Sequence, residues 1–129
     1  MHWCERYIGQ PYESGSADCA RLLAQVRRDV FGLPVPTEIE IDRAASRLGR
    51  AGQMNDLVEI FGEKTDTPKE GDAVLMFCRG RPSHIGVYCE IDGERCVLHA
   101  MENAGHTVLH KIRELSRVGL SVEGYYAWK

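Results

Sequence analysis

The pattern of apolar positions divides the chain into a helical first half and a strand-like second half. Four aliphatic residues recur at the three- and four-residue spacing of an amphipathic helix: Leu22, Leu23, Val26 and Val30. Gly32 and Pro34 end this helix, because neither residue continues helical backbone well. We expect further helices over about 2–9, 38–48 and 54–61.

Beyond residue 62 the spacing of apolar residues becomes that of β-strands. Residues 83–91 and 94–100 flank Asp92-Gly93, the strongest short signal for a β-hairpin. The expected strands are 73–78, 83–91, 94–100, 107–110 and 122–128. Helices followed by strands predict an α+β domain over 1–129, with an antiparallel sheet of about five strands.

The hairpin brings two histidines together. If Asp92-Gly93 is a two-residue turn, counting back along the strands pairs Gly86 with His99. His84 lies two residues from Gly86 on the same face, so the two histidines are diagonal neighbours at roughly 7–8 Å. At that separation one imidazole can act as a base while the other orients it. We expect Gly86 to leave open space between them.

The same register assigns the other side chains of the hairpin to faces. Tyr88 should share the face of the histidines, while Ile85, Val87 and Cys89 should point the other way. A single strand histidine is more often a satisfied sheet residue. We leave His2, His106 and His110 in that role.

Cys19 stands at the beginning of the expected helix. Asp18 is a good N-cap, which leaves Cys19 at the first helical position. The aligned peptide dipoles there stabilise the thiolate, and the free amides of the first turn can bind an oxyanion. The alternative is that Cys19 packs as a small apolar residue, as most free cysteines do.

Composition and charge exclude several classes of function. The chain has 129 residues, 43% hydrophobic and 27% charged, with a formal net charge of -3. These values are typical of a globular protein without general affinity for nucleic acid or anionic membranes. No apolar stretch is long enough to span a membrane, and the N-terminus lacks the pattern of a signal peptide. We therefore expect synthesis in a cytoplasm.

The cysteine pattern indicates neither a disulfide framework nor structural zinc. The five cysteines are Cys4, Cys19, Cys78, Cys89 and Cys96, and no Cys-x-x-Cys pair occurs. A metal site built from Cys19, His84 and His99 is conceivable, because thiolate and imidazole suit zinc, but it lacks a clear fourth ligand.

Four short motifs occur in an order that resembles the NlpC-type papain-like cysteine peptidases, which cut peptidoglycan. They are Asp18-Cys19, Gly71-Asp72, His84-Ile85-Gly86-Val87-Tyr88 and His99-Ala100, and Gly9-Gln10-Pro11-Tyr12 also matches. The resemblance covers nearly the whole chain. The ending Val122-Glu123-Gly124-Tyr125-Tyr126 and the compact size resemble the phage branch of this family, in which small peptidases belong to the tail-tip or tail-assembly apparatus.

The resemblance implies a papain-like fold and a catalytic triad. Cys19 would be the nucleophile, His84 the general base and His99 the orienting residue, with no metal or organic cofactor. Tyr12, Asp18 and Ser83 would lie in the substrate or oxyanion region. The implied substrate is the stem peptide of peptidoglycan, at the bond between D-glutamate and the diamino acid. The implied partners are tail proteins of a phage or a phage-like gene transfer particle.

One departure from the family pattern keeps alternatives open. Ala20-Arg21 follows the cysteine where family members often carry Ser-Gly or Trp-Gly. This departure motivates a second hypothesis, a structural tail module with little or no activity. Transfer of an acyl group to an amine is a third hypothesis that uses the same residues. If the helix packs against the sheet face opposite the histidines, Cys19 does not reach them. For the peptidase we expect the other arrangement, with the N-terminus of the helix over Gly86 and the sulfur roughly 3–4 Å from a ring nitrogen of His84.

Overall fold

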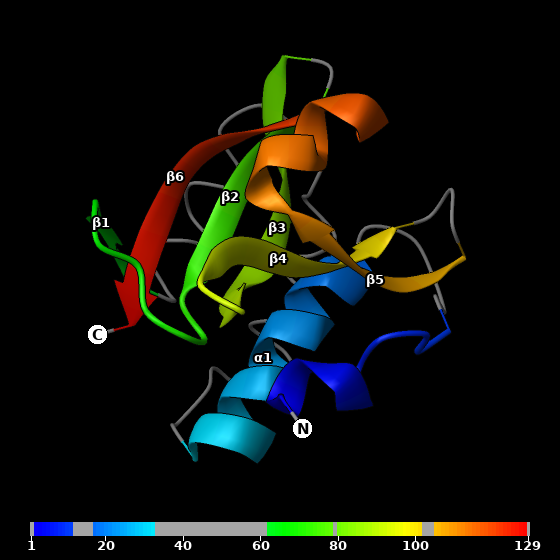
Figure 1. Cartoon of the computed structure of the whole chain (residues 1–129), viewed down its shortest axis with the longest axis vertical. Helices are drawn as coiled ribbons and strands as arrows, with labels where there is room; N and C mark the ends of the chain where they lie inside the picture. Colours follow the sequence, from blue (N-terminus) through cyan, green and yellow to red (C-terminus); the bar gives the residue numbers. More distant parts are fainter. Residues whose placement is uncertain (1, 12–16, 33–61, 79, 102–104, 129) are drawn as a thin grey trace.

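The computed structural model describes residues 2–11, 17–32, 62–78, 80–101 and 105–128. In these residues an antiparallel sheet of six strands is accompanied by one α-helix and two 3-10 helices (Figure 1). The helices are η1 (Trp3–Arg6), α1 (Ala17–Phe31) and η2 (Ile112–Val118). The strands are β1 (Gly62–Thr65), β2 (Ala73–Cys78), β3 (Arg81–Ile91), β4 (Glu94–Met101), β5 (His106–Lys111) and β6 (Leu120–Trp128). The helices expected over 38–48 and 54–61 lie outside the described residues.

The strands lie in the order β1-β6-β2-β3-β4-β5. Strands β2 to β5 follow one another, and η2 then carries the chain back so that β6 pairs with β2. All five predicted strands are present, and the antiparallel α+β sheet is confirmed. The sixth strand, β1, was not predicted, because Gly62-Glu63-Lys64-Thr65 has no apolar alternation. It is an edge strand paired with β6, and polar residues are common at such edges.

The register predicted for the β3–β4 hairpin is confirmed. Asp92 and Gly93 both have positive φ, 53° and 76°, as a two-residue type I′ turn requires. The observed partners include Ile91 with Glu94 and Val87 with Leu98. Counting on from these pairs sets Gly86 opposite His99, as expected.

Helix α1 begins two residues before Cys19. The expectation that Asp18 caps the helix is therefore wrong, and Cys19 is its third residue. Alanine has the highest helix propensity of any residue type, which favours a helix that begins at Ala17. Cys19 remains within the first turn, where the dipole effect acts. The predicted C-terminus is confirmed, because Gly32 follows Phe31 with a left-handed φ of 62°.

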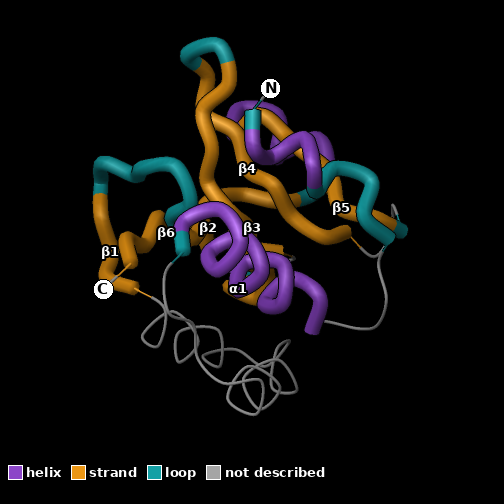
Figure 2. Tube along the Cα trace, turned by 90° about the horizontal axis from the view of Figure 1, so that it is seen from below, coloured by secondary structure: helices purple, strands orange, loops and turns teal. Residues whose placement is uncertain are grey.

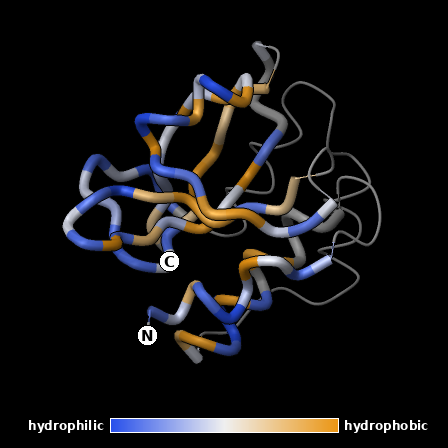
Figure 3. Tube along the Cα trace, turned by 45° about the vertical axis from the view of Figure 1, so that its right-hand side comes forward, coloured by the Kyte–Doolittle hydropathy of each residue, from blue (hydrophilic) through white to orange (hydrophobic). Residues whose placement is uncertain are grey.

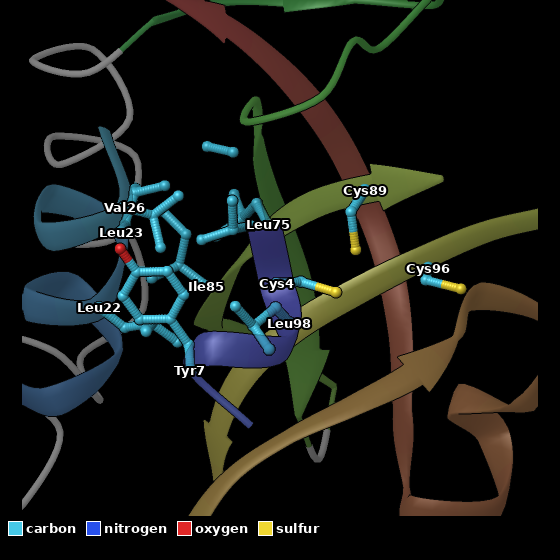
Figure 4. Packing of buried hydrophobic residues seen from close by; sticks show 12 residues of the cluster. Cys4, Tyr7, Leu22, Leu23, Val26, Leu75, Ile85, Cys89, Cys96 and Leu98 are labelled. Atoms are coloured by element: carbon cyan, nitrogen blue, oxygen red, sulfur yellow. The ribbon is translucent and has the colours of Figure 1, made fainter. Parts of the chain in front are cut away.

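The sheet separates two apolar clusters. On one face, Leu22, Leu23 and Val26 of α1 pack against sheet residues that include Ile85 and Val87 (Figures 2 and 4). The opposite face is covered by η2, whose Leu115 packs with side chains from four strands: Val74, Met76, Tyr88, Val97 and Leu120. The middle parts of the strands are accordingly among the most apolar in the molecule (Figure 3). Tyr88 thus points away from Ile85, Val87 and Cys89, as predicted.

The N-terminal segment is attached to the sheet at two places. Glu70 accepts a hydrogen bond from Trp3 Nε1 at 3.2 Å and lies 2.9 Å from His2 Nε2. Further on, Pro11 forms an isolated antiparallel bridge with His106 at the start of β5. The first predicted helix is only the single turn η1, and of the residues that follow it Tyr7 is 4% exposed and Ile8 is 43% exposed.

Candidate active site

Two of the predicted site residues meet in the structure. His84 Nε2 lies 2.8 Å from His99 Nδ1, with the ring centroids 5.0 Å apart and the rings nearly perpendicular. His84 is paired with Met76, which lies in the cluster on the η2 face. Directly opposed residues point to the same side of a sheet, so the two histidines lie on the η2 face together with Tyr88.

His110 joins the pair from the next strand. Its Nδ1 lies 2.8 Å from His99 Nε2, and the two ring centroids are 5.1 Å apart. The three imidazoles therefore form one continuous chain across β3, β4 and β5. The sequence analysis left His110 as a satisfied sheet residue, and its place in β5 with a hydrogen-bonded ring fits that prediction, although its contact with His99 was not predicted.

The register between β4 and β5 places His110 next to His99. The four residues 102–105 separate β4 from β5, and a hairpin closed by them pairs His99 with Val108, as observed. His110 is then diagonal to His99, just as His84 is on the other side. No turn signal as strong as Asp92-Gly93 fixes this loop length in advance.

Desolvation lowers the pKa of His84 and of His99, so both rings are neutral at pH 7. Desolvation lowers the pKa of His84 to about 4. Desolvation, with smaller contributions from His84 and His110, lowers the pKa of His99 to about 2. His99 is fully buried, yet both of its ring nitrogens have hydrogen-bond partners, as a buried polar group requires. A neutral imidazole has an unprotonated ring nitrogen that can accept a proton, but the lowered pKa makes each of these two rings a weaker base than a histidine in water.

Gly86 does not leave open space between the histidines, contrary to expectation. A Cβ atom at this position would lie 2.5 Å from Val97 Cγ2, 2.9 Å from the Leu98 carbonyl oxygen and 3.1 Å from His99 Cβ. The side chains of β4 fill the volume above the glycine. Gly86 is therefore required by close packing of the hairpin beneath the His84–His99 pair.

The Gly71-Asp72 motif has a structural role. Gly71 N–H donates to the Tyr88 carbonyl at 2.9 Å, and Tyr88 N–H donates to the Asp72 carbonyl at 2.7 Å. A Cβ atom at Gly71, which has a φ of 91°, would lie 2.5 Å from Cε2 of Phe31. The motif thus anchors the start of β2 to β3 and gives the C-terminal end of α1 a close contact.

The other predicted site residues are described only in part. The side chains of Cys19, Asp18 and Ser83 lie outside the described part of the chain, and so does the whole of Tyr12. The backbone of Cys19 belongs to the first turn of α1. Whether its sulfur meets His84 therefore remains a prediction.

Helix α1 does not pack on the face that we expected. Its aliphatic side chains contact Ile85 and Val87, and these point away from the histidines. The helix stripe of Leu22, Leu23 and Val26 is buried best against aliphatic side chains, which the other face offers. A contact between Cys19 and His84 would have to form past the end of the strands.

The position of α1 along the sheet is favourable for such a contact. Phe31 fixes one end of the helix beside Gly71, which is bonded to Tyr88. At its other end, Ala17 follows Pro11 by six residues, and Pro11 is bridged to His106, the partner of Met101 at the end of β4. In Figure 1 the first turn of α1 lies toward this end of β4.

A second cluster of reactive side chains lies on the α1 face. Cys4, Cys89 and Cys96 are buried there, and Figure 4 shows their sulfur atoms on the side of the cluster away from α1. Burial is the largest effect on all three thiols and raises the pKa of each. Among the described side chains, no group of three His, Cys, Asp or Glu residues is arranged to hold a metal ion.

Comparison with known proteins found no family model that matches the chain, and no curated protein or solved structure that matches it. In the described part of the chain, no helix is long and apolar enough to cross a membrane.

Proposed function

We propose that the chain is a papain-like cysteine peptidase that hydrolyses an amide bond in the stem peptide of peptidoglycan. The observation that carries the proposal is the hydrogen bond between His84 and His99. It joins the two histidines that the family resemblance names as base and orienting residue. The bond expected to be cut links D-glutamate to the diamino acid, and the setting is the tail of a phage or phage-like particle.

The proposed reaction uses the ring nitrogen of His84 that does not face His99. His84 Nδ1 takes the proton of the Cys19 thiol, and the thiolate attacks the amide carbonyl carbon. Amides of the first turn of α1 stabilise the oxyanion, and the protonated His84 returns its proton to the leaving amine. Water, deprotonated by His84, then cleaves the thioester and restores the thiol.

The length of α1 supports this assignment. Cys19 precedes Phe31 by twelve residues, or about 18 Å of helix. His84 precedes Tyr88 by four residues, or about 13 Å of strand. With Phe31 at the level of Tyr88, a helix that runs along β3 passes the level of His84 near Leu22, and Cys19 lies about 5 Å beyond that level. The length of the helix therefore brings the cysteine to the end of β3 that carries His84.

The experiment is hydrolysis of purified muropeptides, with new amino termini identified by mass spectrometry. Wild-type protein should release fragments at one bond, while Cys19→Ala and His84→Ala should each lower the rate by about a thousandfold or more. Cys78→Ala is the matched control, since Cys78 lies at the end of β2 and has no proposed role. Hydrolysis that survives Cys19→Ala would refute the proposed nucleophile.

One observation favours a second candidate, a tail module that keeps the fold without the chemistry. The pKa of His84 is lowered to about 4 by burial, which disfavours the imidazolium of a thiolate–imidazolium pair. Arg21, next but one to Cys19, also departs from the family pattern. A thiol probe separates the two candidates at neutral pH. Labelling of Cys19 much faster than that of the partly exposed Cys78 supports the peptidase, and labelling of Cys19 no faster than that of Cys78 supports the module.

A further inference from the structure

The hydrogen-bonded chain of His84, His99 and His110 includes a third imidazole, which a catalytic pair of histidines does not need. His99 is fully buried and uses both ring nitrogens, whereas His84 and His110 are only partly buried. Both nitrogen–nitrogen distances are 2.8 Å, which requires one hydrogen atom in each contact. Two bare nitrogens or two N–H groups could not approach so closely without repulsion.

The proton count leaves only two arrangements. A neutral His99 carries one N–H, so it donates to one neighbour and accepts from the other. If His99 donates from Nε2 to His110, its Nδ1 accepts from His84 Nε2–H, and His84 Nδ1 keeps a free electron pair. If the order is reversed, His84 Nε2 accepts and the hydrogen of a neutral His84 sits on Nδ1.

Only the first arrangement makes His84 a base toward Cys19. His84 Nδ1 is the nitrogen left over after the bond to His99, and it must be unprotonated to take the thiol proton. In the reversed arrangement the neutral ring presents an N–H to the cysteine. The direction of hydrogen bonding in the chain therefore decides whether the site is active.

We propose that His110 is a positioning residue that sets this direction by accepting a hydrogen bond at Nδ1. The partly exposed ring of His110 can carry its own hydrogen on Nε2, the tautomer that neutral histidine favours in water. Its Nδ1 then accepts from His99 Nε2–H, which in turn requires His84 Nε2–H. The catalytic consequence rests on the proposed function, whereas the proton order does not.

Two substitutions at position 110 distinguish the effect of the hydrogen-bond acceptor from the effect of the size of the ring. In His110→Asn, Oδ1 can take the place of Nδ1 and accept the same hydrogen bond. In His110→Phe, a ring of similar size offers no acceptor, so the direction of the chain is no longer fixed. His2→Asn is the control. His2 takes no part in the hydrogen bonds that join His84, His99 and His110, and asparagine can replace it as the N-cap of η1.

The primary measurement is the tautomer of each histidine, read from nitrogen-15 NMR of labelled protein without substrate. Wild type, His110→Asn and His2→Asn should show Nε2–H at both His84 and His99, and His110→Phe should show a mixture or the reverse. The second measurement is hydrolysis of muropeptides. His110→Phe should lower kcat by about tenfold or more at unchanged KM, and His110→Asn should restore most of it.

The outcomes distinguish failure of this inference from failure of the proposed function. Nδ1–H at His84 in the wild type overturns the inference, as does an unchanged proton order and kcat in His110→Phe. The expected proton order in a wild type that hydrolyses nothing supports the role of His110 in ordering the chain and refutes the peptidase.

Discussion

The two faces of the sheet each bury a group of three reactive side chains, and burial has opposite consequences for them. The α1 face holds the thiols of Cys4, Cys89 and Cys96, and the η2 face holds the imidazoles of His84, His99 and His110. On both faces desolvation favours the neutral form. A neutral thiol is a poor nucleophile, whereas a neutral imidazole is the basic form.

The comparison explains how one small protein can contain five cysteines when the proposed reaction uses only one of them. The thiols of the α1 face behave as small apolar groups and need few hydrogen bonds. The imidazoles of the η2 face have ring nitrogens that need hydrogen-bond partners, and the three imidazoles provide these partners for one another. Cys19, in the first turn of α1, belongs to neither group.

The largest expected effect is protection of the three buried thiols. Their alkylation by iodoacetamide at pH 8 should be at least about a thousandfold slower in native protein than in denaturant, because reaction requires opening of the core. Peptide mass mapping measures each cysteine separately. Rapid labelling of Cys89 in native protein would contradict the conclusion that burial makes the thiols of the α1 face unreactive.

The pH dependence of the free energy of unfolding tests whether His99, on the η2 face, is buried in its neutral form. The pKa of His99 is about 2 in the folded protein against 6.5 in the unfolded chain, so above pH 6.5 both states are neutral and stability is complete. As the pH falls below 6.5, the unfolded chain binds a proton that the folded protein does not. Stability should fall by up to about 1.4 kcal/mol per pH unit from this group alone.

The measurement is urea unfolding of wild type and His99→Gln between pH 7 and pH 4. The curve of free energy of unfolding against pH should be shallower for the variant, and comparison of the two curves cancels groups such as Asp72. Parallel curves would show that His99 is protonated in the folded state, which contradicts its burial as a neutral link.

A smaller effect is expected from filling the space at Gly86. Gly86→Ala should cost about 1–3 kcal/mol of unfolding free energy, because the new methyl group meets Val97 and the Leu98 backbone. Gly124→Ala is the matched control, because its Cβ would lie 2.8 Å from Cε of the flexible Lys64 side chain and 3.4 Å from Tyr126 Cε2, and it should change stability by about 0.5 kcal/mol or less. Equal effects in thermal unfolding would refute the packing role given to Gly86.

The parts of the fold that could be predicted are those with strong local signals. Asp92-Gly93 fixed one hairpin register, and from it the pairing of His84 with His99 followed. Strand β1 was missed because its polar residues pair at an edge, and η2 was missed because a 3-10 helix of seven residues is too short to show a clear period. The face on which α1 packs depends on tertiary burial, which a hairpin register does not determine. The contact of His110 with His99 was not predicted, because no turn signal as strong as Asp92-Gly93 sets the register between β4 and β5.

The central claim, that His84 activates Cys19, is tested most directly by the pH dependence of Cys19 alkylation. Iodoacetamide rates at Cys19 and Cys78 should be measured from pH 4 to pH 9 in wild type, His84→Ala and His2→Asn. The account predicts that Cys19 of wild type and His2→Asn reacts faster at pH 7 than an ordinary thiol, because neutral His84 takes the thiol proton as the sulfur attacks. In His84→Ala its profile should move up toward an ordinary thiol, with a midpoint nearer about 8.5. Identical Cys19 profiles in wild type and His84→Ala would contradict the account.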